Sequence, residues 1–516
     1  MASERESIIM RIERTKNTID GFVWGATGKI VNTVLPFVLR TVMIYKLGVE
    51  YLGLNSLFAS ILQVLSLSEL GFSYACVYAM YKPIAEDDYK AVGAILSYLK
   101  KIYYFIGSGV LVLGLCLIPF LSQIIHGEVP KDINIHVLYL IYLANSVLSY
   151  FFCAYKSSLL SALQCNAVIN KVGLITNTLL RIMQGMVLFI VPNYYLYVVL
   201  IPITTLINNI IKAYIVNKNY PQYLKKAAID ENIRADIKKR IAPLIGVKIS
   251  TVLMNAADTL VISAFLGLTE TALYNNYFFI MSSVQSIVYE IHSSMLAGVG
   301  NSLVVENKDN ALKKFEMLHF INAWLVIFCT VCFICLYQPF MQIWVGKELM
   351  LPFGMVILFS AYFYFTTIQR IMIVYKDAAG IWKEDMFRCY ASCAINILLN
   401  VVFVRYLGLY GVIGSSVFVS VVIDPLMAKT VYRFIFQKPC KTFYLYFTKD
   451  IFICCLTCML FIVICSKMRY GWIGIIIRGL SCLIGVNLTL LLIYRKDWRF
   501  DSAKEWALRL INCVFK

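Results

Sequence analysis

Two lysines lie inside hydrophobic segments, and the segments that carry them repeat one another. Lys29 begins a hydrophobic run that reaches Leu47-Gly48-Val49, and Lys248 begins a run that reaches Leu266-Gly267-Leu268, 219 residues later. A cation inside an apolar segment is costly unless it faces a water-filled cavity or a partner. The repeated lysines therefore predict a positively charged pathway between two halves of the chain and a negatively charged substrate.

Other polar side chains follow the two lysines at helical spacing and occur in further apolar segments. Residues three or four apart share one helix face, and polar faces in lipid must point to a cavity or to another helix. The alternative is that the amides and hydroxyls only join helices, or that Arg40 extends toward the outer surface. The predicted substrate-binding residues are Lys29, Arg40, Arg181, Lys248, Asn255, Gln63 and Gln285.

Three carboxylates also lie in apolar segments: Glu69, Asp258 and Glu290. Intramembrane carboxylates can carry protons or other ions, and they can equally pair with a buried lysine. We predict these three residues as candidates for ion coupling, with neutralisation of a neighbouring cation as the open alternative for Asp258.

Motifs for catalysis and for resident cofactors are missing from the sequence. Gly28-Lys29 resembles the end of a phosphate loop, but position 23 is valine where that loop requires glycine. The pairs Cys332/Cys335 and Cys455/Cys458 have metal-ligand spacing, but they lie in apolar helices without further ligands nearby in the sequence, and we interpret them as packing residues. We expect no cofactor, no metal and no enzymatic activity.

The composition is that of an all-α integral membrane protein. Of 516 residues, 60% are hydrophobic and 15% are charged, against about 25% charged in soluble domains. A spanning helix needs about 20 apolar residues, and such runs predict about fourteen spans. Their approximate centres are residues 33, 64, 111, 147, 180, 205, 255, 285, 327, 363, 396, 420, 457 and 482.

The net charge of +18 reports topology rather than nucleic-acid binding. With a cytoplasmic N-terminus and alternating spans, external loops carry few basic residues: Lys46, Lys131, Lys347, Arg405, Lys467 and Arg469. The remaining basic residues fall mostly in cytoplasmic segments, as the positive-inside rule requires. An even span count places both termini in the cytoplasm.

The repeat divides the chain into two lobes that start in the same orientation, as parallel repeats do. Between them, residues 225–241 place isoleucines four apart among basic residues, which indicates an amphipathic surface helix. The predicted order is a cytoplasmic amphipathic N-terminus (1–20), a six-span N-lobe (21–217), a cytoplasmic linker (218–242), a six-span C-lobe (243–437), an added hairpin (438–494) and a cytoplasmic interfacial tail (495–516).

Several of these motifs resemble one family of transporters. The residues that carry the resemblance are Pro36, Arg40, Leu47-Gly48, Tyr51-Leu52-Gly53-Leu54 and Leu70-Gly71-Phe72, then Asn255-Ala256-Ala257-Asp258, and then Asn396, Asn400 and Leu407-Gly408-Leu409-Tyr410-Gly411. Over residues 15–440 the chain resembles bacterial Wzx-type polysaccharide flippases of the multidrug/oligosaccharidyl-lipid/polysaccharide (MOP) exporter superfamily.

The resemblance implies two six-helix lobes around a central cavity in the bacterial inner membrane. It implies alternating access and an undecaprenyl-pyrophosphate-linked oligosaccharide as substrate. We expect Lys29 and Lys248 to hold the pyrophosphate, with the open alternative that they only set the potential of the cavity. Membrane lipids, a polysaccharide polymerase and glycosyltransferases are the implied partners; nucleic acid is not one. Two alternatives stay open: another exporter of the same fold, for lipid II or drugs, and a membrane enzyme that polymerises or ligates glycans.

Overall fold

The computed structural model describes residue 28, residue 31 and residues 33–514, apart from residues 66–71, 126–128, 226 and 469–470. The side chains of residues 74, 232, 236, 238–245, 248, 297, 304 and 509–514 also lie outside the described set. The described residues form helices joined by short turns and contain no strand, as an all-α protein predicts. They fall into two compact units, Met1–Ala272 (unit 1) and Leu273–Lys516 (unit 2).

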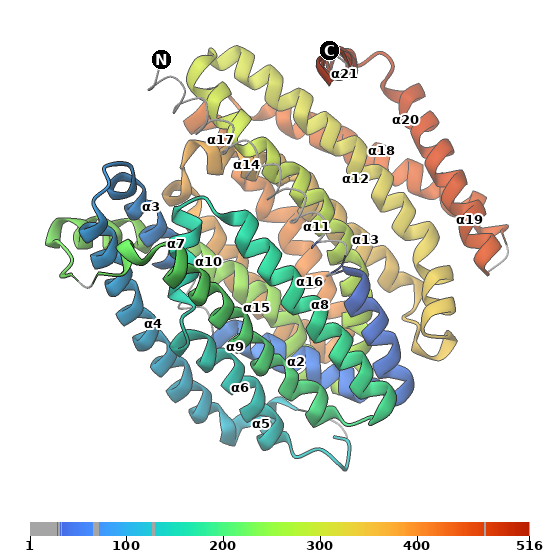
Figure 1. Ribbon diagram of the computed structural model, residues 1–516. Helices are drawn as coiled ribbons and strands as arrows, with labels where there is room; N and C mark the ends of the chain where they lie inside the picture. The colour runs from blue at the N-terminus through green and yellow to red at the C-terminus, as the bar shows by residue number, and fades with distance from the viewer. Residues whose placement is uncertain are drawn as a thin grey trace. The chain divides into compact units, whose positions relative to one another are not determined.

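Unit 1 contains the helices drawn from blue to green in Figure 1. It begins with a helix over residues 33–46. It continues with α2 (Val49–Leu65), α3 (Phe72–Ala85), α4 (Tyr89–Leu117), η2 (Ile118–Phe120), α5 (Leu121–Ile124), α6 (Ile135–Phe151), α7 (Tyr155–Ala162), α8 (Asn166–Ile190), α9 (Tyr194–Asn219), η3 (Pro221–Leu224), α10 (Glu231–Phe265) and the start of α11 (Leu268–Val305).

Unit 2 holds the rest of α11 and the chain that follows it. Its remaining elements are α12 (Lys308–Trp344), η4 (Lys347–Leu349), α13 (Phe353–Ile368), α14 (Arg370–Ala379), α15 (Trp382–Leu407), α16 (Leu409–Val422), η5 (Asp424–Leu426), α17 (Met427–Val431), η6 (Tyr432–Phe436), α18 (Lys441–Ser466), α19 (Trp472–Ser481), η7 (Cys482–Val486), α20 (Asn487–Tyr494) and α21 (Trp498–Val514).

The structure confirms a multi-pass, all-α membrane architecture without confirming the count of fourteen spans. Among the described residues, nine helices are long and apolar enough to cross a membrane, and the bent pair α6–α7 makes a tenth. Each of the fourteen predicted centres nevertheless lies within a described helix.

The two copies of the sequence repeat form the same turn. The Gly48 amide donates to the Met43 carbonyl at 3.1 Å, and 219 residues later the Gly267 amide donates to the Ile262 carbonyl, also at 3.1 Å. Both glycines have positive φ, 126° and 95°, which a residue with a Cβ rarely adopts. The Leu-Gly motif therefore ends a helix in the same way in each copy.

The second copy packs closely on the first. A Cβ at Gly53 in α2 would lie only 2.3 Å from the carbonyl oxygen of Leu268. This contact requires glycine at position 53, because a larger residue would push the two backbones apart. It brings the turn of the second copy against the helix that follows the turn of the first.

The predicted boundaries differ from the compact units. Helix α10 packs on α2 and α3, so the expected seventh span lies in unit 1. The expected amphipathic surface helix is not separate, because α10 runs continuously from Glu231 to Phe265. The division into lobes 21–217 and 243–437 stays a prediction.

The tail after residue 495 is anchored by a buried arginine. Arg499 is fully buried, donates to Asp497 at 3.1 and 3.0 Å, lies 3.6 Å from Asp450 and stacks on the Tyr446 ring at 3.9 Å. Burial by itself raises the pKa of the Asp497 carboxyl, but hydrogen bonds from Arg499 and Lys449 outweigh burial and lower this pKa to about 2. The start of α21 is thus held against α18.

Candidate functional site

Two arginines from different helices of unit 1 share one polar neighbourhood. Arg40 belongs to the helix over residues 33–46 and Arg181 belongs to α8, and the charge of Arg181 acts on Arg40. Both guanidinium groups also act on the hydroxyl of Tyr197 in α9. Two like charges in a low-dielectric interior raise each other's energy. An anion bound beside them would relieve that repulsion.

Helix α8 fixes the direction of Arg181. Gln184 lies three residues further along the same face, accepts from the Arg181 guanidinium at 3.1 Å, and donates to the Tyr197 backbone carbonyl at 3.1 Å. Gln184 is fully buried, so this bridge ties the arginine to α9. The buried Nε of Arg181 has no hydrogen-bond partner among the described residues, and no described carboxylate pairs with Arg181.

Tyrosines extend this cationic cluster toward α2. The Tyr142 hydroxyl of α6 donates to Asn55 at 2.7 Å and lies 3.3 Å from the Tyr194 hydroxyl. The charge of Arg181 also acts on Tyr142. The Arg40–Arg181 cluster therefore combines cations with hydroxyl groups, which is the donor chemistry that phosphate and sugar oxygens need.

The structure brings together only part of the predicted site. Lys29 and Glu69 lie outside the described residues, and so does the side chain of Lys248, whose backbone is in α10. Gln63 in α2 and Asn255 in α10 are exposed.

The three remaining predicted residues have different surroundings. Asp258 is buried in α10 of unit 1 at 6% exposure. In unit 2, Glu290 is exposed on α11, while Gln285 donates to the hydroxyls of Thr366 at 2.8 Å and Thr367 at 3.3 Å. Gln285 thus joins α11 to α13, the structural role that the sequence left open for polar intramembrane residues.

Unit 2 contains a polar junction whose central residue was missed in the sequence. The Asn322 amide of α12 donates to the carbonyls of Thr367 and Ile368 at 3.1 and 3.0 Å, and its oxygen lies 2.9 Å from His292. Nearby, Arg370 stacks over the Tyr289 ring at 4.5 Å. Asn322 is one of the few polar residues in the apolar part of α12, and it was the available signal for this junction.

A second network in unit 2 joins charged side chains of α14, α15 and η5. Arg388 forms two hydrogen bonds to Asp385, at 2.6 and 2.7 Å, and one to Asp424 at 2.6 Å. Lys376 donates to Asp385 at 3.0 Å, and Ser392 donates to Asp424 at 3.0 Å. These charges are already paired, so they hold α14, α15 and η5 together rather than offering a ligand site.

Comparison with protein families decides the relationship of this chain. A family model described as "Polysaccharide biosynthesis protein" matches residues 18–297, which is more than half of the chain. The chain belongs to this family. None of the curated proteins compared with the chain matches it significantly.

Solved structures show which fold this polysaccharide biosynthesis protein adopts. It is similar to lipid II flippase MurJ in an inward closed conformation, at 14% identity and a TM-score of 0.66, covering 92% of this chain and 99% of that one. It is also similar to an inward-facing multidrug resistance MATE family transporter of the MOP superfamily, at 14% identity and a TM-score of 0.63, covering 77% of this chain and 94% of that one. At this identity the likeness concerns the fold.

Family and fold agree with the resemblance that the sequence motifs indicated. The chain belongs to a polysaccharide biosynthesis family and shares its fold with a lipid II flippase and with a MATE family transporter. The identity of its substrate depends on the site.

Proposed function

We propose that this protein is a flippase that moves undecaprenyl-pyrophosphate-linked oligosaccharide units across the bacterial inner membrane by alternating access. The observation that carries the proposal is the Arg40–Arg181 cluster inside a member of a polysaccharide biosynthesis family. A pyrophosphate must leave water to cross the bilayer, and paired cations compensate for its lost hydration.

The proposed binding mode assigns the pyrophosphate to cations and the sugars to neutral polar groups. Lys29 and Lys248 hold the pyrophosphate, and Arg40 and Arg181 act as secondary cations. Hydrogen bonds that involve a charged group contribute about 1.5–3 kcal/mol each, so a few such contacts suffice to bind the anion. Asn255 and Gln63 bind the oligosaccharide in this scheme, whereas Gln285 joins α11 to α13.

Movement and topology complete the proposal. The predicted lobes, residues 21–217 and 243–437, alternate between cytoplasmic and external opening, and both chain termini are cytoplasmic. Asp258, Glu69 and Glu290 couple this motion to ion movement. The protein works with the polymerase and glycosyltransferases that use and supply the lipid-linked units.

A second candidate is an exporter of lipid II or of drugs, which the fold itself favours. Lipid II carries a pyrophosphate too, so the arginine cluster suits it equally well. Cationic drugs would instead require carboxylates near the site, and Arg181 pairs with no carboxylate among the described residues. The cluster therefore supports an anionic lipid-linked substrate over a cationic drug.

The test uses a strain whose surface polysaccharide depends on this protein. Lys29→Ala with Lys248→Ala, and separately Arg40→Gln with Arg181→Gln, should abolish surface polysaccharide while the protein persists in the membrane. Lipid-linked units should then accumulate on the cytoplasmic leaflet. Lys101→Gln is the matched control, because Lys101 is an exposed cation of α4.

Two outcomes would argue against the proposal. Unchanged surface polysaccharide in both double variants would show that transport does not require these cationic residues. Units that reach the external leaflet but stay unjoined would indicate that the protein acts after flipping.

A further inference from the structure

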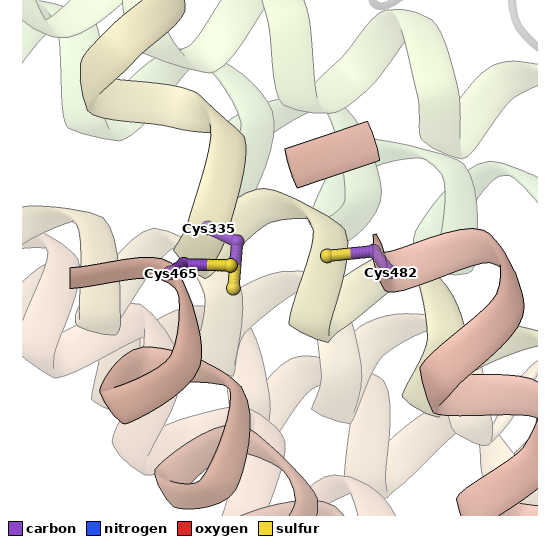
Figure 2. Close-up of side chains that lie close together, drawn as sticks. All are labelled: Cys335, Cys465 and Cys482. Carbon is purple, nitrogen blue, oxygen red and sulfur yellow. The ribbon is translucent and has the colours of Figure 1, made fainter. Parts of the chain in front are cut away.

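Three cysteines that are distant in sequence converge within unit 2. The Sγ atoms of Cys335, Cys465 and Cys482 all lie within 4.8 Å of one another, and all three residues are buried. They come from α12, α18 and η7, and Figure 2 shows their sulfur atoms directed toward a common point. Cys332 lies three residues before Cys335 on α12, and its thiol interacts with that of Cys482.

Cys465 and Cys482 thus supply the additional thiols that the sequence around Cys332 and Cys335 lacks. Residues three apart share a face of α12, so both thiols point to the same side. The interpretation of this pair as isolated packing residues is therefore incomplete. CxxC spacing on one element and single cysteines from two others is a common way to build a thiolate site.

Local backbone and charge at the cluster point in the same direction. Cys482 begins η7, a π-helical turn inserted between α19 and α20, and such turns are frequent at functional sites. Arg478, one helical turn earlier, is 5% exposed and donates to the carbonyls of Cys335 at 3.4 Å and Met468 at 2.6 Å. These contacts hold a cation beside the thiols.

We propose that these cysteines bind one soft d¹⁰ metal ion, Zn²⁺ or Cu⁺. Cys335, Cys465 and Cys482 are the ligands, and Cys332 completes a four-sulfur site. With metal–sulfur bonds of about 2.3 Å, ligand sulfurs stand roughly 3.8–4.0 Å apart. The sulfurs of Cys335, Cys465 and Cys482 lie within 4.8 Å of one another, so each of these three pairs needs to approach by no more than about 1 Å. Binding displaces the thiol protons, one for each ligand.

The metal would join the added hairpin to the rest of unit 2. Cys465 and Cys482 lie on the two arms of the hairpin, and Cys332 and Cys335 lie on α12, against which the hairpin packs. Thiolates are the preferred ligands of such soft ions. The site is independent of the proposed transport function, because none of its residues belongs to the predicted substrate site.

The first experiment measures metal in the wild-type protein. The full chain, purified in detergent with a tag free of histidine and cysteine, is incubated under reducing conditions with Zn²⁺ or with Cu⁺, passed through a desalting column and analysed by elemental mass spectrometry. We expect roughly one equivalent per chain of one of the two ions. X-ray absorption should show a sulfur-only shell at about 2.3 Å, with four sulfurs for zinc or three for copper.

The second experiment identifies the ligands. Cys335→Ser and Cys482→Ser should each lose the bound metal. Cys458→Ser is the matched control and should retain the metal. Cys458 is not one of the proposed ligands, since its sulfur lies 4.0 Å from that of Cys454 within α18.

Three results would overturn the proposal. The first is no metal in the wild type after either incubation, which does not depend on how the variants fold. The second is metal retained by the Cys335→Ser/Cys482→Ser double variant. The third is a disulfide among the four cysteines in protein alkylated at lysis.

Discussion

Replacing Asp385 by asparagine should strongly destabilise unit 2. Asp385 is fully buried, and it accepts two hydrogen bonds from Arg388 and one from Lys376. The side chains of these two partners are 15% and 5% exposed. Asparagine has nearly the same shape but no charge, so the substitution leaves two cations in the interior with one carboxylate, Asp424, nearby.

The expected size of the effect follows from burial and from the size of the unit. Removing one partner of a buried ion pair costs about 3–5 kcal/mol. Unit 2 has roughly 240 residues, and an unfolding entropy of about 2.1 cal/mol/K per residue makes 1 kcal/mol equivalent to about 2 °C. Asp385→Asn should therefore lower the melting temperature of unit 2 by about 6–10 °C.

The assay is thermal unfolding of the purified protein in detergent, followed by tryptophan fluorescence. Glu384→Gln is the matched control, because Glu384 precedes Asp385 on the same helix and is exposed. This control should change the melting temperature by less than about 1 °C, as surface substitutions do. If Asp385→Asn melts within 1 °C of Glu384→Gln, the network does not hold unit 2 together in the way described.

Three further predictions concern unit 1 and the tail. Arg181→Gln should reduce transport about 10- to 150-fold, the equivalent of one charge-assisted hydrogen bond of about 1.5–3 kcal/mol, and Lys101→Gln should not. Gly93→Ala should lower the melting temperature of unit 1, since its Cβ would lie 2.1 Å from a backbone oxygen, whereas Gly109→Ala in the same helix meets nothing within 4 Å and should be neutral or stabilising. Asp497 has a lowered pKa of about 2 in the folded protein. Its stabilising effect should therefore be full above its unfolded pKa near 4 and disappear as the pH falls toward about 2. The difference in melting temperature between wild type and Asp497→Asn should decrease over the same pH range.

Each of these predictions has a contrary outcome. Equal transport rates for Arg181→Gln and wild type would show that Arg181 does not bind the substrate. A melting temperature for Gly93→Ala equal to that of Gly109→Ala would mean that the chain near Lys225 moves away at no cost. A constant difference between wild type and Asp497→Asn from pH 6 to pH 2 would show that this carboxylate is not what titrates.

Local sequence was informative where a backbone requirement fixed the residue type. The sequence repeat placed a Leu-Gly pair at equivalent positions in two segments. The structure gives the reason, because Gly48 and Gly267 end their helices with positive φ and matching hydrogen bonds. Apolar runs likewise located the helices, since lipid requires about 20 apolar residues per span. Fold class and family followed from these patterns.

Partners distant in sequence could not be predicted in the same way. Arg388 forms a hydrogen bond to Asp424, which lies 36 residues away on another element. Gln285 likewise bonds Thr366, 81 residues away. A polar face looks the same in sequence whether it lines a cavity or joins two helices, and only packing distinguishes the two.

Transbilayer movement of a lipid-linked oligosaccharide by the purified protein tests the central claim most directly. Liposomes that contain the protein and an undecaprenyl-pyrophosphate-linked oligosaccharide are prepared, and the fraction of oligosaccharide that an added glycosidase can reach is followed in time. The account predicts that wild-type protein exposes the inner-leaflet pool, whereas the Arg40→Gln/Arg181→Gln variant leaves it protected. Equal protection in protein-free and wild-type liposomes, with an imposed membrane potential or proton or sodium gradient, would contradict it.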